Sequence, residues 1–150
     1  MDEIKVSVIV PAYNTEVYIE RMIECLLKQT YGNLQLIFID DGSTDKTADI
    51  IKSFTDSRIE YYYQKNAGVS AARNAGLKRA TGEKLFFFDS DDTFEPSLIR
   101  DCIDYAQANN VESVLYGYGN KVNGKVMNEH VFKLEGVYRD DRIIDEVIPA

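Results

Sequence analysis

Three carboxylates close an apolar run at residues 85–92, which read Leu-Phe-Phe-Phe-Asp-Ser-Asp-Asp. Asp89, Asp91 and Asp92 are near enough in sequence for their charges to repel, which raises the pKa of a carboxyl group that has no partner. A divalent cation that prefers oxygen ligands, Mg²⁺ or Mn²⁺, relieves this repulsion and also binds the phosphates of a substrate. The acid cluster therefore predicts chemistry on a phosphorylated ligand held with the help of a metal ion.

Two other apolar runs also end in polar residues. Tyr13 and Asn14 follow the first run; they suit an ordinary loop, but a Tyr in this position can also stack on a nucleotide base. Asp41 follows the second run, and its carboxylate can accept a hydrogen bond from the N3–H of uracil or a similar imide. The alternative for Asp40 and Asp41 is a turn and capping of the next helix, because Asp-Gly-Ser-Thr is a good cap sequence by itself. The two interpretations can coexist, since Ser43 or Thr44 can serve as the cap.

The segment at residues 68–76 is rich in small residues and contains one long cationic side chain, Arg73. Small residues suit a helix packed closely against a sheet, and Arg73 is open to that interpretation as well. A guanidinium near a ligand site can bind a pyrophosphate through charge-assisted hydrogen bonds, and the N-terminus of a helix also favours anions. We therefore expect Arg73 to bind the phosphates of the ligand.

Apolar runs of strand length alternate with segments of helical spacing along most of the chain. Strands are expected at residues 4–10, 34–39, 58–64, 83–88 and 113–118, and helices at residues 17–29, 48–54, 69–80 and 96–106. Gly82 is expected to terminate the third helix. Asn123-Gly124 predicts a β-hairpin near the C-terminus, over residues 121–126.

This alternation predicts an α/β fold, Rossmann-like, with a mainly parallel central sheet and helices on both faces. Ligands of such sheets bind beyond the carboxyl ends of the strands. The segments at residues 11–14, 40–43, 66–68 and 89–92 all follow expected strands. The fold therefore predicts that they meet in one ligand site at one edge of the sheet.

Composition narrows the class of protein. A net charge of −8 over 150 residues argues against nucleic acid as a partner, because binding to phosphate backbones needs a basic face. Cys25 and Cys102 fall in expected helices, where they are expected to be small buried hydrophobes. Residues 1–5 are acidic and lack the long apolar segment of a signal peptide, and no apolar run approaches about 18 residues, so a cytoplasmic protein without a transmembrane segment is expected. The oligomeric state is left open.

Five blocks in this chain resemble the family 2 glycosyltransferases, which have the A-type nucleotide-sugar-binding fold. The blocks are VIVPAYN at residues 8–14, QTY at 29–31, IDDGSTD at 39–45, NAGVSAARN at 66–74 and FDSDD at 88–92. They occur in order and at compatible spacing over about residues 4–118. An Asp-x-Asp motif alone is weak evidence, whereas five ordered blocks are specific.

The resemblance implies inverting transfer of a sugar from a nucleotide donor, usually uridine-linked, to the hydroxyl of a carbohydrate or lipid-linked acceptor in cell-surface polysaccharide synthesis. It implies that Asp89 lies near the ribose and donor sugar, and that Asp91, with Asp92 nearby, binds the Mn²⁺ or Mg²⁺ that bridges the pyrophosphate. The expected donor-binding residues are Pro11, Ala12, Tyr13, Asn14, Asp41, Arg73, Asp89 and Ser90, of which Pro11, Ala12, Tyr13 and Asp41 hold the base.

The carboxylate base that inversion requires has no candidate in a recognisable context. Family members usually supply it from a Glu-Asp-type segment well downstream, and no Glu-Asp dipeptide follows Asp92; the acidic pairs there are Asp140-Asp141 and Asp145-Glu146. We therefore expect an N-terminal fragment, with residues 1–118 as the donor-binding region and residues 119–150 as the start of the acceptor side. We also expect any association with a membrane to come from regions outside this chain.

Two alternatives compete with this interpretation. Residues 86–93 also fit the Asp-x-Asp-x-Thr signature of phosphatases of the haloacid dehalogenase type, but that family has the motif near its N-terminus and needs more chain after it. The second alternative is a non-catalytic nucleotide-binding module. A dinucleotide dehydrogenase is excluded, because no Gly-x-Gly-x-x-Gly follows the first strand.

Overall fold

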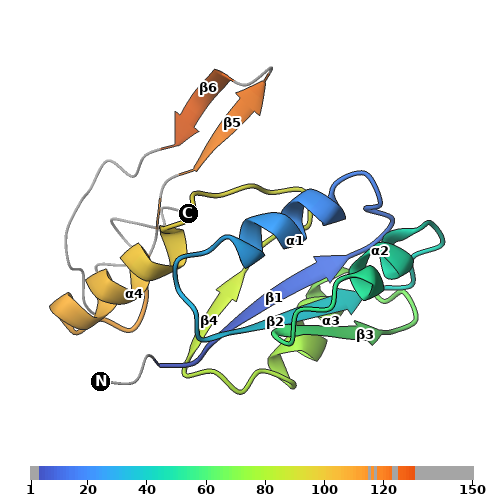
Figure 1. The fold of residues 1–150 in the computed structure, drawn as a ribbon, viewed down its shortest axis with the longest axis horizontal. Helices are drawn as coiled ribbons and strands as arrows, with labels where there is room; N and C mark the ends of the chain where they lie inside the picture. The colour runs from blue at the N-terminus through green and yellow to red at the C-terminus, as the bar shows by residue number, and fades with distance from the viewer. Residues whose placement is uncertain (1–3, 115, 117, 123–124, 131–150) are drawn as a thin grey trace. The chain divides into compact units, whose positions relative to one another are not determined.

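The computed structural model describes residues 4–114, 116, 118–122 and 125–130 (Figure 1). The chain divides into two compact units, Met1–Arg100 and Asp101–Ala150. The expected functional division after residue 118 stays a prediction. Among the described residues, none of the helices has the length and apolar character that a membrane span requires.

The first unit alternates strands and helices. Its elements are β1 (Val6–Ala12), α1 (Ile19–Leu27), β2 (Leu34–Asp40), α2 (Thr47–Ser53), β3 (Ile59–Tyr63), α3 (Val69–Leu77), β4 (Lys84–Phe87) and the start of α4 (Leu98–Asn109). The four strands are parallel and stand in the order β3-β2-β1-β4. This confirms the expected α/β fold with a parallel sheet.

The core lies on both faces of the two central strands, and every residue of β1 and β2 is buried. Figure 1 shows α1 and α2 on one face of the sheet and α3 on the other. On the α3 face, Ile9, Ile37 and Ile39 pack with Ala72. Because successive side chains of a strand point to opposite faces, a nearly continuous apolar strand needs helices on both sides.

The prediction that Gly82 terminates the third helix is wrong. The helix α3 ends at Leu77, and its last turn closes with the N–H of Lys78 donating to Asn74 O and Gly76 O. A Cβ on Gly82 would lie 2.5 Å from the backbone nitrogen of Ser7 and 2.8 Å from the carbonyl oxygen of Lys5. The glycine is therefore needed where the chain passes close to β1, a contact between segments far apart in sequence.

A buried amide, Gln35, links several elements near the amino ends of the parallel strands. Its Oε1 accepts hydrogen bonds from Ser7 Oγ at 2.6 Å and from Thr81 N at 2.9 Å. Its Nε2 donates to Glu60 Oε1 at 3.0 Å and to Arg79 O at 3.1 Å. The residue is only 5% exposed. Burial of a polar amide is tolerated here because both of its ends are hydrogen-bonded, so the group stabilises the fold.

The strand expected at residues 113–118 is displaced in the second unit. The strand β5 (Tyr118–Val122) pairs antiparallel with β6 (Lys125–His130). Residues 113, 114 and 116 are not in a strand, and the described ladder begins with the pair Tyr118↔His130. The antiparallel pair confirms a hairpin near the C-terminus, while Asn123-Gly124 lies outside the described residues.

The turn before β3 contains an ion pair whose contribution to stability depends on pH. Arg58 Nη2 donates to Asp56 Oδ2 at 2.9 Å, and the backbone N–H of Arg58 donates to Asp56 Oδ1 at 2.9 Å. The side-chain hydrogen bond from Arg58, followed by that from its backbone, lowers the pKa of Asp56 below its ordinary value of 3.8. The carboxylate therefore stabilises the folded chain above its unfolded-state pKa, and this contribution is lost as pH falls through the folded-state pKa.

We expect Asp56→Asn to lower the free energy of unfolding at neutral pH by at most about 1 kcal/mol, since the pair is partly exposed. The difference from wild type should disappear in acid, where Asp56 is protonated in both states. Urea unfolding at a series of pH values measures this. A difference that stays constant into strong acid would show that the ion pair is not its cause.

Candidate functional site

The candidate site lies where the carboxyl ends of the parallel strands meet. The loops after β1, β2 and β4 and the loop before α3 lie at this edge of the sheet (Figure 1). Pro11 and Ala12 are the last residues of β1, are buried, and pair with Ile39 and Asp40 of β2. Tyr13 follows them and is 50% exposed. Its ring is thus presented at the surface by a rigid, buried strand.

The side chain of Asn14 ties the loop after β1 to the loop after β2. Asn14 Oδ1 accepts a hydrogen bond from Thr44 N at 2.8 Å, and Asn14 N donates to Ser43 Oγ at 3.0 Å. The residue adopts φ = 50°, in the left-handed region that Asn tolerates better than most residues. Asn14 therefore has a structural role here, and its contact with the donor stays a prediction.

The part of the alternative interpretation in which Ser43 or Thr44 caps the second helix is wrong. The helix α2 begins at Thr47, and within the described part of the chain its N-cap residue, Lys46, makes no side-chain cap hydrogen bond. Asp45 Oδ1 instead accepts a hydrogen bond from Thr47 N at 2.9 Å. Ser43 and Thr44 do not cap the helix because they are hydrogen-bonded to Asn14. The local sequence does not reveal this contact.

Asp40 has a structural environment. It is 1% exposed, its Oδ1 accepts from Ser43 N at 2.8 Å, and its Oδ2 accepts from the hydroxyl of Tyr61 at 2.7 Å. Burial, followed by the hydrogen bond to Asp40, raises the pKa of Tyr61 well above its ordinary value. Asp40 therefore stabilises the turn, as the alternative from the sequence expected.

Asp41 holds the loop that leads into α3. Asp41 Oδ1 accepts hydrogen bonds from Gln64 Nε2 at 2.7 Å and from Ala67 N at 2.9 Å, and Oδ2 accepts from Gly68 N at 2.8 Å. The residue is 3% exposed. A carboxylate has about four acceptor positions, so these three bonds leave Oδ2 able to accept one more hydrogen bond. Asp41 is thus fixed in position and retains capacity for a ligand donor.

Arg73 and Asp89 are brought together by the fold. Arg73 comes from α3 and Asp89 follows β4, and Arg73 Nη2 lies 2.6 Å from Asp89 Oδ1. The Nε of Arg73 is shielded from solvent and has no hydrogen-bond partner among the described residues. Because both side chains are partly exposed, with 37% and 54% of their surfaces accessible, a ligand at this edge can reach them.

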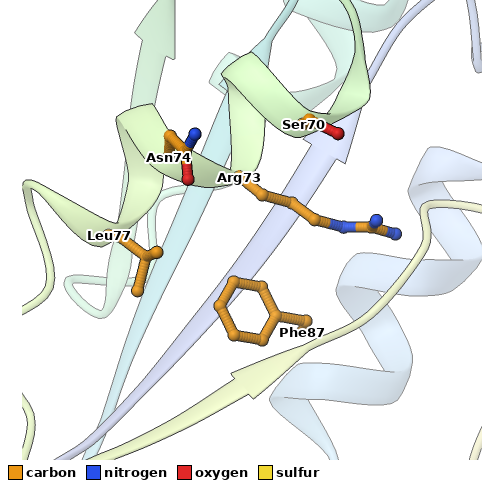
Figure 2. Close-up of a pocket in the computed structure, with 5 residues that line it drawn as sticks. All are labelled: Ser70, Arg73, Asn74, Leu77 and Phe87. Carbon is orange, nitrogen blue, oxygen red and sulfur yellow. The ribbon is translucent and has the colours of Figure 1, made fainter.

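A pocket of about 430 Å³ lies beside this ion pair, between α3 and the edge strand β4. It is lined by Ser70, Arg73, Asn74, Leu77 and Phe87, and Figure 2 shows the side chain of Arg73 extending past the ring of Phe87. Phe87 and Leu77 supply apolar surface, and the other three supply hydrogen-bonding groups. Phe87 was not predicted as a site residue, because its place in an apolar run indicates only a strand residue.

The acid cluster forms a tight turn directly after β4. Asp92 N donates to Asp89 O at 3.1 Å, Ser90 is 7% exposed, and Asp91 and Asp92 are exposed. Partial burial raises the pKa of Asp92 above its ordinary value, and the negative charges of Asp89 and Asp91 raise it further. The backbone hydrogen bond with Asp89 lowers this pKa by less than these effects raise it. The turn therefore concentrates negative charge that a cation would neutralise.

The chemistry of these acids suits a divalent cation that takes few protein ligands. Asp89 is paired with Arg73, which leaves Asp91 and Asp92 available. Within the part of the chain that the structure describes, no group of three or more His, Cys, Asp or Glu side chains is placed to hold a metal. Mg²⁺ and Mn²⁺ in phosphate-binding sites commonly take one or two carboxylates and complete their coordination with phosphates and water. The site fits a cation of that kind.

The chain matches the model of Glycosyl transferase family 2 over residues 7–143. It is similar to Glycosyltransferase GlyA of Streptococcus pneumoniae, with 44% identity over 97 residues, which are 63% of this chain and 14% of the relative. It is also similar to S. aureus TarS 1–349 in complex with UDP-GlcNAc, with a TM-score of 0.70 and 29% identity over 87% of this chain and 38% of that one.

A third similar protein is the mannosyltransferase PcManGT of Pyrobaculum calidifontis in complex with GDP-Man and Mn²⁺. The TM-score is 0.63 and the identity 25%, over 70% of this chain and 33% of that one. The chain thus spans well under half the length of these three proteins. The TM-scores of the TarS and PcManGT structures show that this chain shares their fold.

Proposed function

The chain belongs to glycosyl transferase family 2, and we propose that it binds a nucleotide-sugar donor and takes part in transfer of the sugar to an acceptor hydroxyl. The observation that carries this proposal is the convergence of an exposed aromatic ring, a fixed buried carboxylate, a guanidinium and two free carboxylates at one edge of the sheet. These are the groups that a base, a diphosphate and its cation require. The five sequence blocks supply most of them.

The base is proposed to lie between Tyr13 and Asp41. Tyr13 offers an exposed ring for stacking, and the remaining acceptor position of Asp41 suits the N3–H of uracil. Pro11 and Ala12 end the buried strand that carries Tyr13. The similarity to a TarS structure with UDP-GlcNAc supports a uridine-linked donor.

The diphosphate is proposed to lie between Arg73 and the acid turn. The guanidinium of Arg73 donates charge-assisted hydrogen bonds to phosphate oxygens, and Ser90 and Asp89 adjoin the ribose and donor sugar. Asp91 and Asp92 would hold Mn²⁺ or Mg²⁺, and the similarity to PcManGT with GDP-Man and Mn²⁺ supports a divalent ion. When bound, such an ion stabilises the negative charge that develops on the departing nucleoside diphosphate.

Inversion at the sugar needs a carboxylate on the face opposite the leaving group, to take the proton of the acceptor hydroxyl. The acidic pairs Asp140-Asp141 and Asp145-Glu146 lie outside the described residues. We propose that the donor half of the reaction is held by residues 11–92 and that the base comes from elsewhere in the protein. Inverting transfer to a carbohydrate or lipid-linked acceptor, in polysaccharide synthesis, remains part of this proposal.

Membership of family 2 leaves the phosphatase alternative without support. In that alternative Asp89 would be the phosphoryl nucleophile, yet its carboxylate is paired with Arg73. The non-catalytic nucleotide-binding module makes the same binding predictions as the donor half of an enzyme, and transfer assays on the full-length protein separate the two.

A thermal-shift series tests donor binding directly. We expect UDP and UDP-sugars to raise the unfolding midpoint in the presence of Mn²⁺, with a stabilisation of about 2.7 kcal/mol at 100 times the dissociation constant. Without metal the shift should shrink strongly, and simple phosphate esters should give none. Equal stabilisation by phosphate esters and by UDP would contradict recognition of a nucleotide.

A further inference from the structure

The side chain of Gln29, just after the C-terminus of α1, bonds to the segment that returns from the acid turn. Its Nε2 donates to Glu95 O at 2.8 Å, and its Oε1 accepts from Ile99 N at 3.2 Å. The amide is 6% exposed. Ile99 lies in the first turn of α4, where backbone N–H groups have no partner within the helix. Gln29 therefore fixes both the end of the returning segment and the beginning of α4.

Further contacts hold the same connection. Thr30 N donates to Pro96 O at 2.8 Å, beside the Gln29 contacts. The rings of Phe88 and Phe94 stack with their centroids 4.1 Å apart, on either side of the acid turn. Arg21 Nη2, from α1, donates to Asp91 O at 3.2 Å. The turn is thus closed by two stacked rings and anchored to α1 and to the residues that follow it.

We propose that Gln29 is a positioning residue for Asp91 and Asp92, holding the acid turn in the shape that binds the cation of the donor complex. This rests on the proposed function. A turn whose ends are fixed loses less conformational freedom when its carboxylates bind an ion, so the binding is tighter. Gln29 itself touches neither the ion nor the donor, and it acts through the backbone of residues 95–99.

The test replaces Gln29 with Met, which has nearly the same volume and length but cannot make the two hydrogen bonds. UDP binding by the full chain is titrated calorimetrically at increasing Mn²⁺, which gives the half-saturating Mn²⁺ concentration. We expect Gln29→Met to raise that concentration by on the order of tenfold, as loss of groups that orient metal ligands commonly does. Binding of uridine without metal should be unchanged, since Tyr13 and Asp41 lie on other loops.

Gln35→Met is the matched control. Gln35 is a similarly buried amide whose two ends are also both hydrogen-bonded, but it lies at the amino ends of the strands, away from the acid turn. The Gln35→Met variant should lower the unfolding midpoint as Gln29→Met does, without changing the half-saturating Mn²⁺ concentration. If both variants shift the Mn²⁺ requirement equally, or neither does, Gln29 has only a stabilising role and the inference is overturned while donor binding stands.

Absence of Mn²⁺-dependent UDP binding by the wild-type chain would instead overturn the proposed function, and this inference with it. Should Gln29→Met fail to unfold cooperatively, Gln29→Asn serves in its place, because it keeps an amide in the site but shortens it by one methylene. The same rise in the Mn²⁺ requirement is then expected, and an unchanged requirement would contradict the inference.

Discussion

Replacement of Asp91 by Asn is expected to remove most of the metal dependence of UDP binding. Asp91 is exposed, and its carboxylate makes no hydrogen bond or ion pair among the described residues. Like Asp92, it is therefore available to a cation, whereas Asp89 is paired with Arg73. We expect the half-saturating Mn²⁺ concentration to rise by about a hundredfold. Loss of a group that only orients a metal ligand raises it by up to about this factor, and Asp91 is expected to contact the ion itself.

Stability of the unliganded chain should not fall in this variant. An exposed carboxylate without partners contributes little to folding, and an amide removes like-charge repulsion within the turn. The measurements are the unfolding midpoint without ligand and the calorimetric titration of UDP over a range of Mn²⁺ concentrations. Asp104→Asn, the same chemical change on the exposed surface of α4, is the control. An unchanged Mn²⁺ requirement would contradict the assignment of Asp91 as a metal ligand.

Asp41→Asn is expected to give the opposite pattern: a loss of stability and of base binding, with little change in the Mn²⁺ requirement. In the wild type both carboxylate oxygens accept hydrogen bonds, from Gln64 Nε2, Ala67 N and Gly68 N. An amide turns one oxygen into a donor that must face another donor. Leaving a buried group unpaired in this way costs about 1–3 kcal/mol.

Urea unfolding measures the stability of Asp41→Asn, and uridine titration without metal measures its binding of the base. Asp104→Asn again serves as the control for the change of charge. If stability falls but uridine affinity is unaltered, Asp41 only anchors the loop before α3, and another group recognises the base. If stability is unaltered, the three hydrogen bonds do not have the strength that their buried geometry implies.

Together the two variants separate the parts of the proposed site. Asp91 and Asp41 lie on loops that follow different strands, and they are expected to act on different parts of one ligand. A loss of metal dependence in one variant and of base affinity in the other would indicate a nucleotide diphosphate bridging the two loops. A ligand bound at only one loop would be affected by one substitution alone.

The sequence predicted the sheet and the ends of the strands at which the candidate site is proposed to lie. Periodicity identified β1 and β2 because strands buried on both faces are nearly continuous in apolar residues, and their observed ends differ from the expected ones by a few residues. The polar segments then had to meet at one edge, since parallel strands end there together. Prediction failed at Gly82 and at the cap of α2, because both depend on contacts with distant residues.

By itself, therefore, the sequence determined the fold class and which loops carry the candidate chemistry, because these follow from local patterns of apolar and polar residues. Only the tertiary structure decided how the polar side chains are shared: Asp89 is paired with Arg73, Asp41 with the loop before α3, and Gln29 with the segment after the acid turn. Each of these contacts joins residues at least 16 positions apart in the chain. Such pairings depend on how helices pack against the sheet, which no local pattern encodes.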